Sequence, residues 1–300
     1  MRSDKKSRFC VLCGHRKLKL HFSLDQQHFF KCRNCQLIQM SPLPEVLKPG
    51  DDYCGYDLKK HQKFARAFLV PQYNRAIQLI QRYKKEGSLL DVGCGAGEFL
   101  EVAQEAGFLP AGIEPSQTAC RIARQKNNVI RGELKDIDLK ENSFDVVTLW
   151  SVLEHVLDPF AFLNKIHFSL RAEGILALRV PSSRGLLPSL ALWLYKISAG
   201  KIDYPLRVIY QLKWHYKHVF FYSWKNVAVL LNTCGFEILE ARAENSFDIK
   251  SLAYRMDYLP KEKICQIAFK TALFLILEFS CLLRRQDELV LVARKSQKNF

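Results

Sequence analysis

The spacing of apolar residues along the chain follows two patterns that alternate through its central part. Short apolar runs, typical of buried strands, alternate with segments in which apolar residues recur every three or four positions, as on one face of a helix. This alternation predicts an α/β fold around a largely parallel sheet. We expect helices at 98–106 and 116–126, and strands at 88–92, 109–113, 129–131, 144–149, 174–180, 236–243 and 288–294.

The chain before the first predicted strand divides into three parts. Residues 1–40 contain four closely spaced cysteines, and 41–52 are rich in proline, which is typical of a linker. From 58 to 85 apolar residues return at helical spacing, and Pro71 is expected to divide this segment into two helices. We therefore predict a first domain over 1–50 and a second over 51–300, with insertions at about 183–217 and 246–286.

Two apolar stretches, 185–200 and 264–283, do not fit the alternation of strands and helices. We expect both to pack against the sheet, while Lys270 within the second stretch argues against a helix that spans a membrane. The alternative is a helix that lies on an anionic membrane surface. Four cations that flank the second stretch would favour this: Lys261, Lys263, Arg284 and Arg285.

The N-terminal cysteines form two C-x-x-C pairs. Two such pairs supply four thiolates at the spacing of a tetrahedral zinc site, and the length between the pairs matches a zinc ribbon. Four thiolates leave no open coordination position, so the zinc is expected to be structural and to supply much of the folding free energy of this short segment. The predicted ligands are Cys10, Cys13, Cys32 and Cys35.

The stretch LLDVGCGAGEFL places Gly93, Gly95 and Gly97 between a predicted strand and a predicted helix. Glycine weakens strands, so a bare backbone here indicates a turn or the close approach of a ligand. The spacing differs from the G-x-G-x-x-G of dinucleotide sites. Asp91, just before the loop, suits a cationic ligand group better than a pyrophosphate. Glu114, at the end of the next strand, lies where an acid would accept hydrogen bonds from ribose hydroxyls.

Composition and charge say little about the fold, but they limit the kinds of molecule that the protein is expected to bind. Hydrophobic residues make up 48% of the chain and aromatic residues 12%, which is typical of a globular protein with a core. The formal charge of +15 indicates acidic partners such as phosphorylated substrates, nucleic acid or an anionic membrane, although solubility alone would also explain it. The basic N-terminus lacks the apolar region of a signal peptide, so a cytoplasmic location is expected.

The motifs taken together resemble one family. DVGCGAG, IEPS, SFDVVTLWSVLEHVLDP and LRAEGILALRVP are similar to segments of class I S-adenosylmethionine-dependent methyltransferases, closely over about 58–182 and again at 218–239 and 287–295. The cysteine module resembles that of the zinc-ribbon-bearing subgroup, which includes sugar C-methyltransferases. The resemblance implies a Rossmann-like seven-stranded sheet in the order 3-2-1-4-5-7-6 with an antiparallel last strand, and S-adenosylmethionine as cofactor.

The resemblance also implies roles for the residues of the loop. Asp91 would serve the methionine amino group, directly or through water. Gly93, Gly95 and Gly97 would pass beneath the methionine and the ribose. Glu114 would hold the ribose hydroxyls, although an acid at this position could instead cap a helix.

Further residues follow from the same resemblance. Glu133 and Leu134 would flank the adenine, although the family more often has Asp at the first position, and Glu133 could be a solvated acid in a turn. Trp150 and Ser151, at the end of the fourth strand, would border the methionine and the methyl group.

Candidate acid–base groups follow the fourth strand. Related ubiquinone-biosynthesis O-methyltransferases have Glu-x-x-Glu-His here, but Ser151 replaces the first acid, so Glu154 and His155 are not expected to hold a divalent metal. His155 could simply orient its loop. In HYKHVFFYSW, His218 matches the His of a Tyr-x-x-His-like element of sugar C-methyltransferases, with His215 in place of the Tyr. We favour His218 as the base, the alternative being a hydrogen bond to a backbone carbonyl.

The expected reaction is methyl transfer from S-adenosylmethionine to a small-molecule, glycan or lipid-linked acceptor. One alternative is an RNA methyltransferase that uses the ribbon and the positive charge, but an Asn/Asp-Pro-Pro-aromatic element is missing, so nucleic acid is not the favoured partner. A second is an inactive zinc-stapled binding module. A nicotinamide dehydrogenase is disfavoured by the glycine spacing. We expect a cytoplasmic protein, with or without peripheral contact to an anionic membrane.

Overall fold

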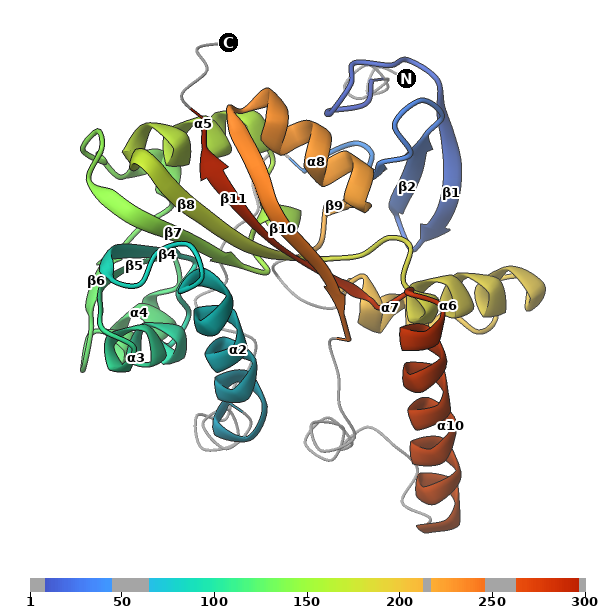
Figure 1. Cartoon of the computed structure of the whole chain (residues 1–300). Helices are drawn as coiled ribbons and strands as arrows, with labels where there is room; N and C mark the ends of the chain where they lie inside the picture. The colour runs from blue at the N-terminus through green and yellow to red at the C-terminus, as the bar shows by residue number, and fades with distance from the viewer. Residues whose placement is uncertain (1–8, 45–64, 213–216, 246–262, 297–300) are drawn as a thin grey trace.

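The computed structural model describes residues 9–44, 65–212, 217–245 and 263–296, and for 263–270 only the backbone (Figure 1). Several sequence predictions lie outside these residues: most of the linker at 41–52, the start of the helical segment from Leu58, His215, and part of the second insertion.

The centre of the molecule is a seven-stranded sheet in the order β10-β11-β8-β7-β4-β5-β6. Strands β4 to β8 pair in parallel, and β11 runs antiparallel to both of its neighbours. Numbered along the chain, this is the predicted order 3-2-1-4-5-7-6, so the predicted fold class is confirmed. The strands are β4 (Gly87–Val92), β5 (Phe108–Glu114), β6 (Asn128–Arg131), β7 (Phe144–Trp150), β8 (Leu170–Pro181), β10 (Phe236–Glu244) and β11 (Glu288–Lys295).

Helices cover both faces of this sheet (Figure 1). Neighbouring residues of a strand point to opposite faces, and Leu89 and Leu90 of β4 accordingly belong to two different apolar clusters. Pro71 lies in the first turn of α2, where its missing N–H leaves no helical hydrogen bond unmade. One face carries α2 (Val70–Ile80), α3 (Glu98–Glu105) and α4 (Gln117–Ala123), and the other carries α5 (Pro159–Ser169) and α8 (Trp224–Thr233). Three short helical turns complete this part: η1 (Ala65–Leu69), η2 (Leu134–Asp136) and η3 (Leu153–His155).

The cysteine module forms a second, four-stranded sheet in the order β1-β2-β3-β9. Its first three strands are β1 (Leu18–Leu24), β2 (Gln27–Cys32) and β3 (Ile38–Met40), but β9 (Phe220–Phe221) comes from the methyltransferase-like part of the sequence. The two parts therefore share a sheet and one continuous apolar cluster.

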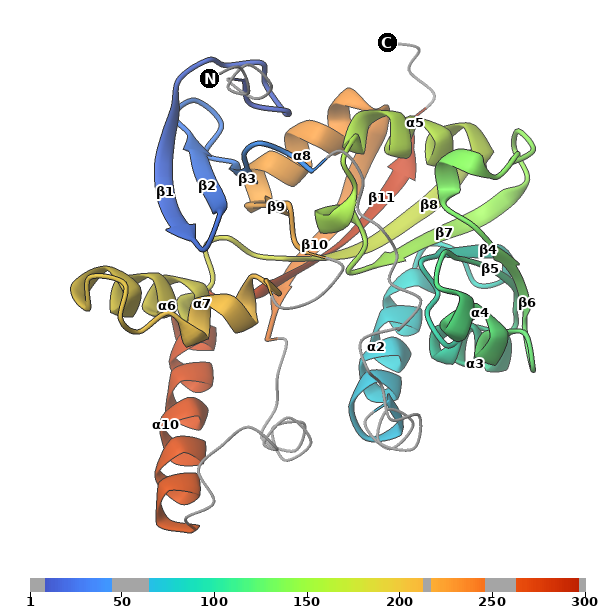
Figure 2. The ribbon, with the colours of Figure 1, turned by 180° about the vertical axis from the view of Figure 1, so that it is seen from behind.

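The two apolar stretches do not pack on the sheet, and that prediction is wrong. They form α6 (Leu186–Ile197) and α10 (Lys263–Leu282). Helix α6 contacts both α10 and the short helix α7 (Tyr204–Ile209) at one corner of the molecule. Helix α10 extends away from the sheet in both views (Figure 2). Leu275 is 60% exposed and Leu282 77%. Other helices already cover both faces of the sheet, which leaves no room there. Among the described helices, none has the length and apolar content needed to cross a bilayer.

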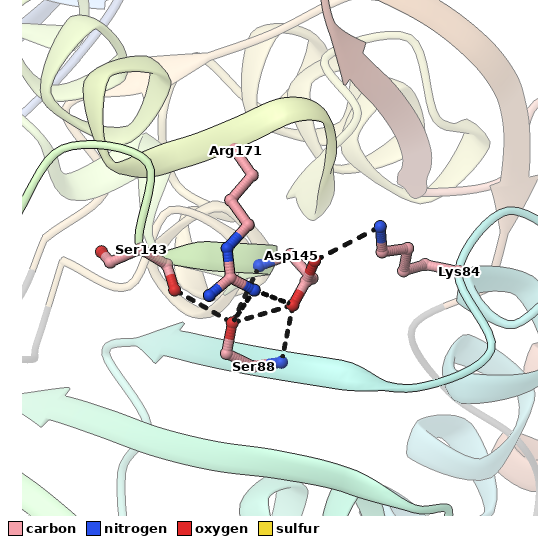
Figure 3. A network of polar contacts seen from close by, with 5 residues as sticks. All are labelled: Lys84, Ser88, Ser143, Asp145 and Arg171. Atoms are coloured by element: carbon pink, nitrogen blue, oxygen red, sulfur yellow. Dashed lines mark hydrogen bonds and ion pairs between the residues drawn. The ribbon is translucent and has the colours of Figure 1, made fainter.

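A polar network connects neighbouring strands of the large sheet at their amino ends, opposite the ends where the strand-to-helix loops begin (Figure 3). Asp145, near the start of β7, accepts hydrogen bonds from the Ser88 N–H at 2.9 Å and from the Ser88 hydroxyl at 3.0 Å. The same carboxylate pairs with Arg171 of β8 and lies 3.3 Å from the Lys84 ammonium. This network holds the amino ends of β4, β7 and β8 together.

Candidate active site

A cavity of about 980 Å³ lies at the carboxyl ends of the parallel strands. Ligands of open α/β sheets bind at this edge, because the strand-to-helix loops gather there. All but one of the predicted cofactor-binding and catalytic residues line it; the exception is Gly97. Those that line it are Asp91, Gly93, Gly95, Glu114, Glu133, Leu134, Trp150, Ser151, Glu154, His155 and His218.

The glycines of the loop between β4 and α3 all have left-handed backbones, with φ of 76° at Gly93, 57° at Gly95 and 92° at Gly97. Side chains rarely tolerate this conformation. A Cβ on Gly93 would lie 2.7 Å from Val152, and one on Gly97 would lie 2.8 Å from the Asn127 amide nitrogen. Gly93 and Gly97 are therefore required by the packing of the protein itself, and Gly97 contacts α4 rather than the cavity.

Glu114 ends β5 and points back to the glycine loop. Its carboxylate accepts hydrogen bonds from the Gly95 N–H at 2.9 Å and the Ser116 N–H at 2.8 Å, and the residue is 4% exposed. Burial raises the pKa of this carboxyl group, and the two backbone hydrogen bonds oppose the rise. The helix α4 is capped by the Ser116 hydroxyl, which accepts from Ala119, so Glu114 is not its cap. The carboxylate thus ties the glycine loop to the next strand at the cavity wall.

Asp91, at the end of β4, is almost fully buried. The Thr148 hydroxyl donates a hydrogen bond of 2.6 Å to its Oδ1 atom, and burial raises its pKa to about 8. Sequence reasoning missed Thr148, although it is the only polar side chain within the apolar run VVTLW. An acid in this position is suited to a cationic group, because a positive charge in the cavity would favour its ionised form.

The predicted adenine-flanking residues both lie at the cavity wall after β6. Leu134 is buried, whereas Glu133 is partly exposed and forms an ion pair of 2.7 Å with Lys135. Ser151, after β7, has a φ of 58°, a left-handed backbone that is uncommon for serine. Its N–H donates to the Arg179 carbonyl at 3.0 Å, which fixes this turn at the cavity.

Arg179 is a second residue that sequence reasoning missed. It lies near the end of β8, is 5% exposed, and its guanidinium group sits 5.5 Å from the centre of the Trp150 ring. Glu288 of β11 lies 3.3 Å from its Nε atom, which compensates the buried charge. A single cation inside the apolar strand LALRVP was the available signal. Arg179 and Phe99, whose ring packs edge-on to Trp150 at 5.0 Å, hold the indole in place.

The predicted catalytic residues Glu154, His155 and His218 come together although two different segments supply them. The His218 Nε2 atom lies 4.0 Å from Glu154 Oε1, and the centres of the two imidazole rings are 4.9 Å apart. The His155 Nδ1 atom lies 3.0 Å from the Lys217 carbonyl, consistent with a loop-orienting role for His155. Among the described residues, neither the Glu154 oxygens nor the His218 ring nitrogens have a hydrogen-bond partner.

Unpaired buried polar atoms are costly, at roughly 1–3 kcal/mol each, so these atoms favour a polar group of a bound molecule or a metal ion. One ligand atom each of Glu154, His155 and His218 lies within 4.8 Å of the others, so His218 supplies a third possible ligand where the sequence alone argued against a metal. Burial raises the pKa of Glu154 to about 8 and lowers the pKa of His155 to about 4. Burial also lowers the pKa of His218 well below its ordinary value. At neutral pH the imidazole of His218 is therefore uncharged, which is the form that accepts a proton.

The four N-terminal cysteines are gathered as a zinc ligand set. The Cys10 and Cys35 sulfur atoms are 3.4 Å apart, those of Cys13 and Cys32 are 3.6 Å apart, and all four lie within 4.8 Å of one another. Tetrahedral zinc with bonds of about 2.3 Å needs sulfur separations of about 3.8 Å, so the cluster fits the ion with small adjustments. Gly14, after the first pair, has a φ of 66° and lets the chain turn around the cluster.

Comparisons with known proteins agree with this geometry. A family model described as "Methyltransferase domain" matches residues 52–241. A ubiquinone biosynthesis O-methyltransferase of Histophilus somni (strain 2336) is 28% identical over 144 residues, which is 40% of this chain and 60% of that protein. One of Rhodopseudomonas palustris (strain TIE-1) is 35% identical over 97 residues, 29% of this chain and 37% of that protein. The chain thus spans less than two thirds of the lengths of these curated relatives.

Solved structures share the fold at low sequence identity. A chain in the complex between the Haloferax volcanii Trm112 methyltransferase activator and a methyltransferase has a TM-score of 0.55 at 15% identity, with 80% of this chain and 95% of that chain covered. An S-adenosylmethionine-dependent methyltransferase from Archaeoglobus fulgidus has a TM-score of 0.50 at 18% identity, with 81% and 100% covered. The family model, the sheet order and the glycine loop lead to one conclusion: the chain belongs to the class I S-adenosylmethionine-dependent methyltransferases.

Proposed function

We propose that this enzyme transfers the methyl group of S-adenosylmethionine to a small-molecule acceptor bound beside Trp150, Glu154 and His218. The observation that carries the proposal is the buried Glu114 carboxylate, which faces the cavity where it joins the glycine loop. S-adenosylmethionine supplies an activated methyl group on a sulfonium. The chain's own work is to orient the two molecules, exclude water and move a proton.

The wall of the cavity supplies a group for each part of the cofactor. Glu114 would accept the ribose hydroxyls, and Asp91 would take the methionine amino group, whose charge favours the ionised acid. Glu133 and Leu134 would flank the adenine, while Trp150 and Ser151 would border the sulfonium. A cation near the indole face gains electrostatic attraction, and the Arg179 guanidinium already occupies such a position.

His218 is the proposed base. Its imidazole is uncharged near neutral pH, and both nitrogens are without hydrogen-bond partners among the described residues. An acceptor hydroxyl could donate its proton to one nitrogen as the oxygen attacks the methyl group. Glu154 lies 4.0 Å away, and its ionised form, which a positive charge on His218 would favour, would stabilise the imidazolium. His155 would hold the loop through the Lys217 carbonyl.

The test uses calorimetry with S-adenosylmethionine and methyl transfer with methyl-labelled cofactor. Glu114→Ala should weaken cofactor binding by roughly 1–3 kcal/mol, the cost of lost hydrogen bonds to a charged group. The matched control is Glu133→Ala, at the partly exposed end of the same cavity, which should have a smaller effect. His218→Asn should leave cofactor affinity unchanged and abolish transfer to a bacterial lipid and metabolite extract. Unchanged affinity in Glu114→Ala would contradict the proposal, and label that enters RNA in a parallel assay with total RNA would contradict the acceptor class.

The acceptor end of the cavity favours an apolar or lipid-linked molecule over a free sugar. Leu187 and Pro188 of α6 and Val208 and Ile209 of α7 line this end, so the cavity continues into the corner that α10 joins. Trp193 on α6 is 57% exposed, and the described part of α10 is apolar on most sides. We propose an acceptor whose polar head reaches His218 while its apolar chain follows these helices.

The same corner suits the surface of an anionic bilayer. Four exposed cations accompany its apolar residues: Lys196, Lys201, Arg284 and Arg285. An apolar surface with bordering cations is the pattern of a helix that lies on a membrane. The side chains of Lys261 and Lys263, which entered the original hypothesis, lie outside the described residues. A cytoplasmic location with peripheral membrane contact accordingly stays a prediction.

Flotation with phosphatidylglycerol vesicles tests the membrane contact. The wild-type protein should float with these vesicles and stay behind with neutral phosphatidylcholine. Leu275→Asp combined with Leu282→Asp should abolish flotation, because each leucine contributes roughly 1.5–3 kcal/mol when buried. Leu109→Asp changes an equally exposed leucine at the far edge of the sheet and should float normally. Wild-type protein that ignores anionic vesicles would contradict the membrane contact.

A further inference from the structure

The cysteine module is built into the wall of the active site. Its strand β3 pairs with β9, with Ile38 opposite Phe221 and Gln39 opposite Phe220. Phe220 and Phe221 directly follow His218 and Val219, and all four residues are buried. The segment that carries the proposed base is therefore an edge strand of the ribbon sheet.

Two backbone hydrogen bonds continue from the ribbon to the catalytic turn. The Met40 N–H donates to the Val219 carbonyl at 2.8 Å, and the Val219 N–H donates to the Glu154 carbonyl at 2.9 Å. Val219 thus links the ribbon on one side to Glu154 on the other, with His218 as its chain neighbour. A displacement of β3 would move both members of the His218–Glu154 pair relative to each other.

Side chains add a second connection at the zinc ligands themselves. The Asn226 amide of α8 donates to the carbonyl of Cys35, while its oxygen accepts from the Ser223 N–H at 2.7 Å. Ser223 caps α8, two residues after Phe221. The loop that carries the last cysteine is therefore joined to the end of the His218 segment.

We propose that zinc binding by the ribbon positions His218 for the methyl-transfer step, while the cofactor half of the cavity is independent of zinc. Without zinc the four cysteines of this short segment return largely to their thiol forms, and the metal–sulfur bonds that join its two C-x-x-C turns are lost. The loss of zinc would release β3, and with it β9 and His218. Asp91, Gly95 and Glu114 lie on β4, β5 and the loop after β4, which share no strand pairing with the ribbon. This inference rests on the proposed role of His218.

The first experiment compares hydrogen exchange in the full-length protein with and without zinc, each with bound S-adenosylhomocysteine. Zinc is removed by a chelator or by Cys13→Ser. Segments 27–40 and 217–223 should both exchange at least about tenfold faster without zinc, because their hydrogen bonds open together. Segment 89–100 should stay protected, and the affinity for S-adenosylhomocysteine should change less than about twofold.

A second variant separates positioning from general loss of the ribbon. Asn226→Asp keeps an oxygen for Ser223 but removes the donor to Cys35, so segment 217–223 should exchange faster with one zinc still bound per chain. The matched control is Asp25→Ala, which breaks the ion pair of 2.6 Å between the ribbon and Arg207 of α7 without touching β9. It should leave segment 217–223 unchanged.

Two results would overturn the inference. The first is segment 217–223 remaining protected in the zinc-free protein while 27–40 opens. The second is loss of S-adenosylhomocysteine binding on zinc removal, which would mean that the metal supports the whole fold. Failure of the zinc-loaded wild type to bind S-adenosylhomocysteine would instead contradict the proposed function, and the exchange data would still report the coupling of the two segments.

Discussion

Single residues in the cavity are held in their uncharged forms by burial. The pKa values of Asp91 and Glu154 are both raised to about 8, and those of the neighbouring histidines are lowered. A charged or polar molecule bound in the cavity would therefore interact with these side chains and offset the free-energy cost of their desolvation. The sequence predicted which residues would line the cavity, because motif and strand ends mark them. It did not predict their protonation, which depends on how deeply each side chain is buried.

The first prediction concerns Glu154 and pH. In the folded protein this carboxyl group stays protonated up to about pH 8, whereas in the unfolded chain it ionises near pH 4.5. The folded state therefore binds more protons between these values, and the free energy of unfolding falls as pH rises. From pH 6.5 to 8, Glu154→Gln should make the slope less negative by up to roughly 1.4 kcal/mol per pH unit, because the histidines whose pKa is lowered contribute equally to the slope in both proteins.

Urea denaturation at pH 6.5, 7.25 and 8 measures the slope. Asp91 contributes a fall of its own, so the variant should reduce the slope rather than remove it. Glu105→Gln, which changes an exposed acid on α3, should keep the wild-type slope. A Glu154→Gln protein with the wild-type slope would mean that Glu154 ionises normally in the folded state.

The second prediction concerns the glycine loop. Gly95→Val forces a β-branched residue into a left-handed backbone beside the ligand, and should lower S-adenosylmethionine affinity more than about tenfold. Gly107→Val imposes a similar backbone conflict in the turn after α3, where no atom lies within 4 Å of the added Cβ. Calorimetry on both variants should find normal affinity only in the second. Equal losses would show that the loop matters for stability alone.

At the scale of elements, the sequence predicts the bounds of the strands to within a few residues. It predicts which strands pair only where the resemblance to a fold family implies the order of the sheet. The runs at 88–92 and 144–149 closely match β4 and β7, because buried parallel strands are continuously apolar. The pairing of β3 with β9 has no such signal. β9 contains only two residues, and its partner lies in the opposite part of the sequence, so neither periodicity nor turn residues mark the contact.

The third prediction tests the network at the amino ends of the strands. Asp145→Ala removes an acceptor from the Ser88 N–H and the ion-pair partner of Arg171, which keeps its hydrogen bond to the Ser88 hydroxyl, so stability should fall by roughly 1–3 kcal/mol. The network lies at the opposite edge of the sheet from the cavity, so S-adenosylmethionine affinity should not change. Urea denaturation and calorimetry on the same preparation provide both values, and a parallel loss of affinity would contradict this separation of the two edges.

At the scale of the whole molecule, the position of the apolar helices was the main error of sequence reasoning. Apolar content predicts that a segment avoids water, but not whether it does so against its own sheet. Phe279 and Leu282 of α10 are 53% and 77% exposed, while other helices cover the faces of the sheet. Part of the formal charge of +15 lies at the same corner, where Lys196, Lys201, Arg284 and Arg285 are exposed beside these apolar helices. The four N-terminal cysteines, in contrast, were correctly predicted to lie together, because their grouping follows from local spacing.

The shared sheet has a consequence for biosynthesis. The ribosome releases β3 before its partner β9, which emerges only after β4 to β8 have been translated. Until then the nascent ribbon has an open strand edge, which is a site for mispairing with other chains. Metal binding soon after synthesis of the ribbon would keep the ribbon folded, and so limit mispairing at the open strand, until β9 has been translated. Cells starved of zinc should therefore accumulate aggregated enzyme during synthesis, even where the mature protein retains its ion.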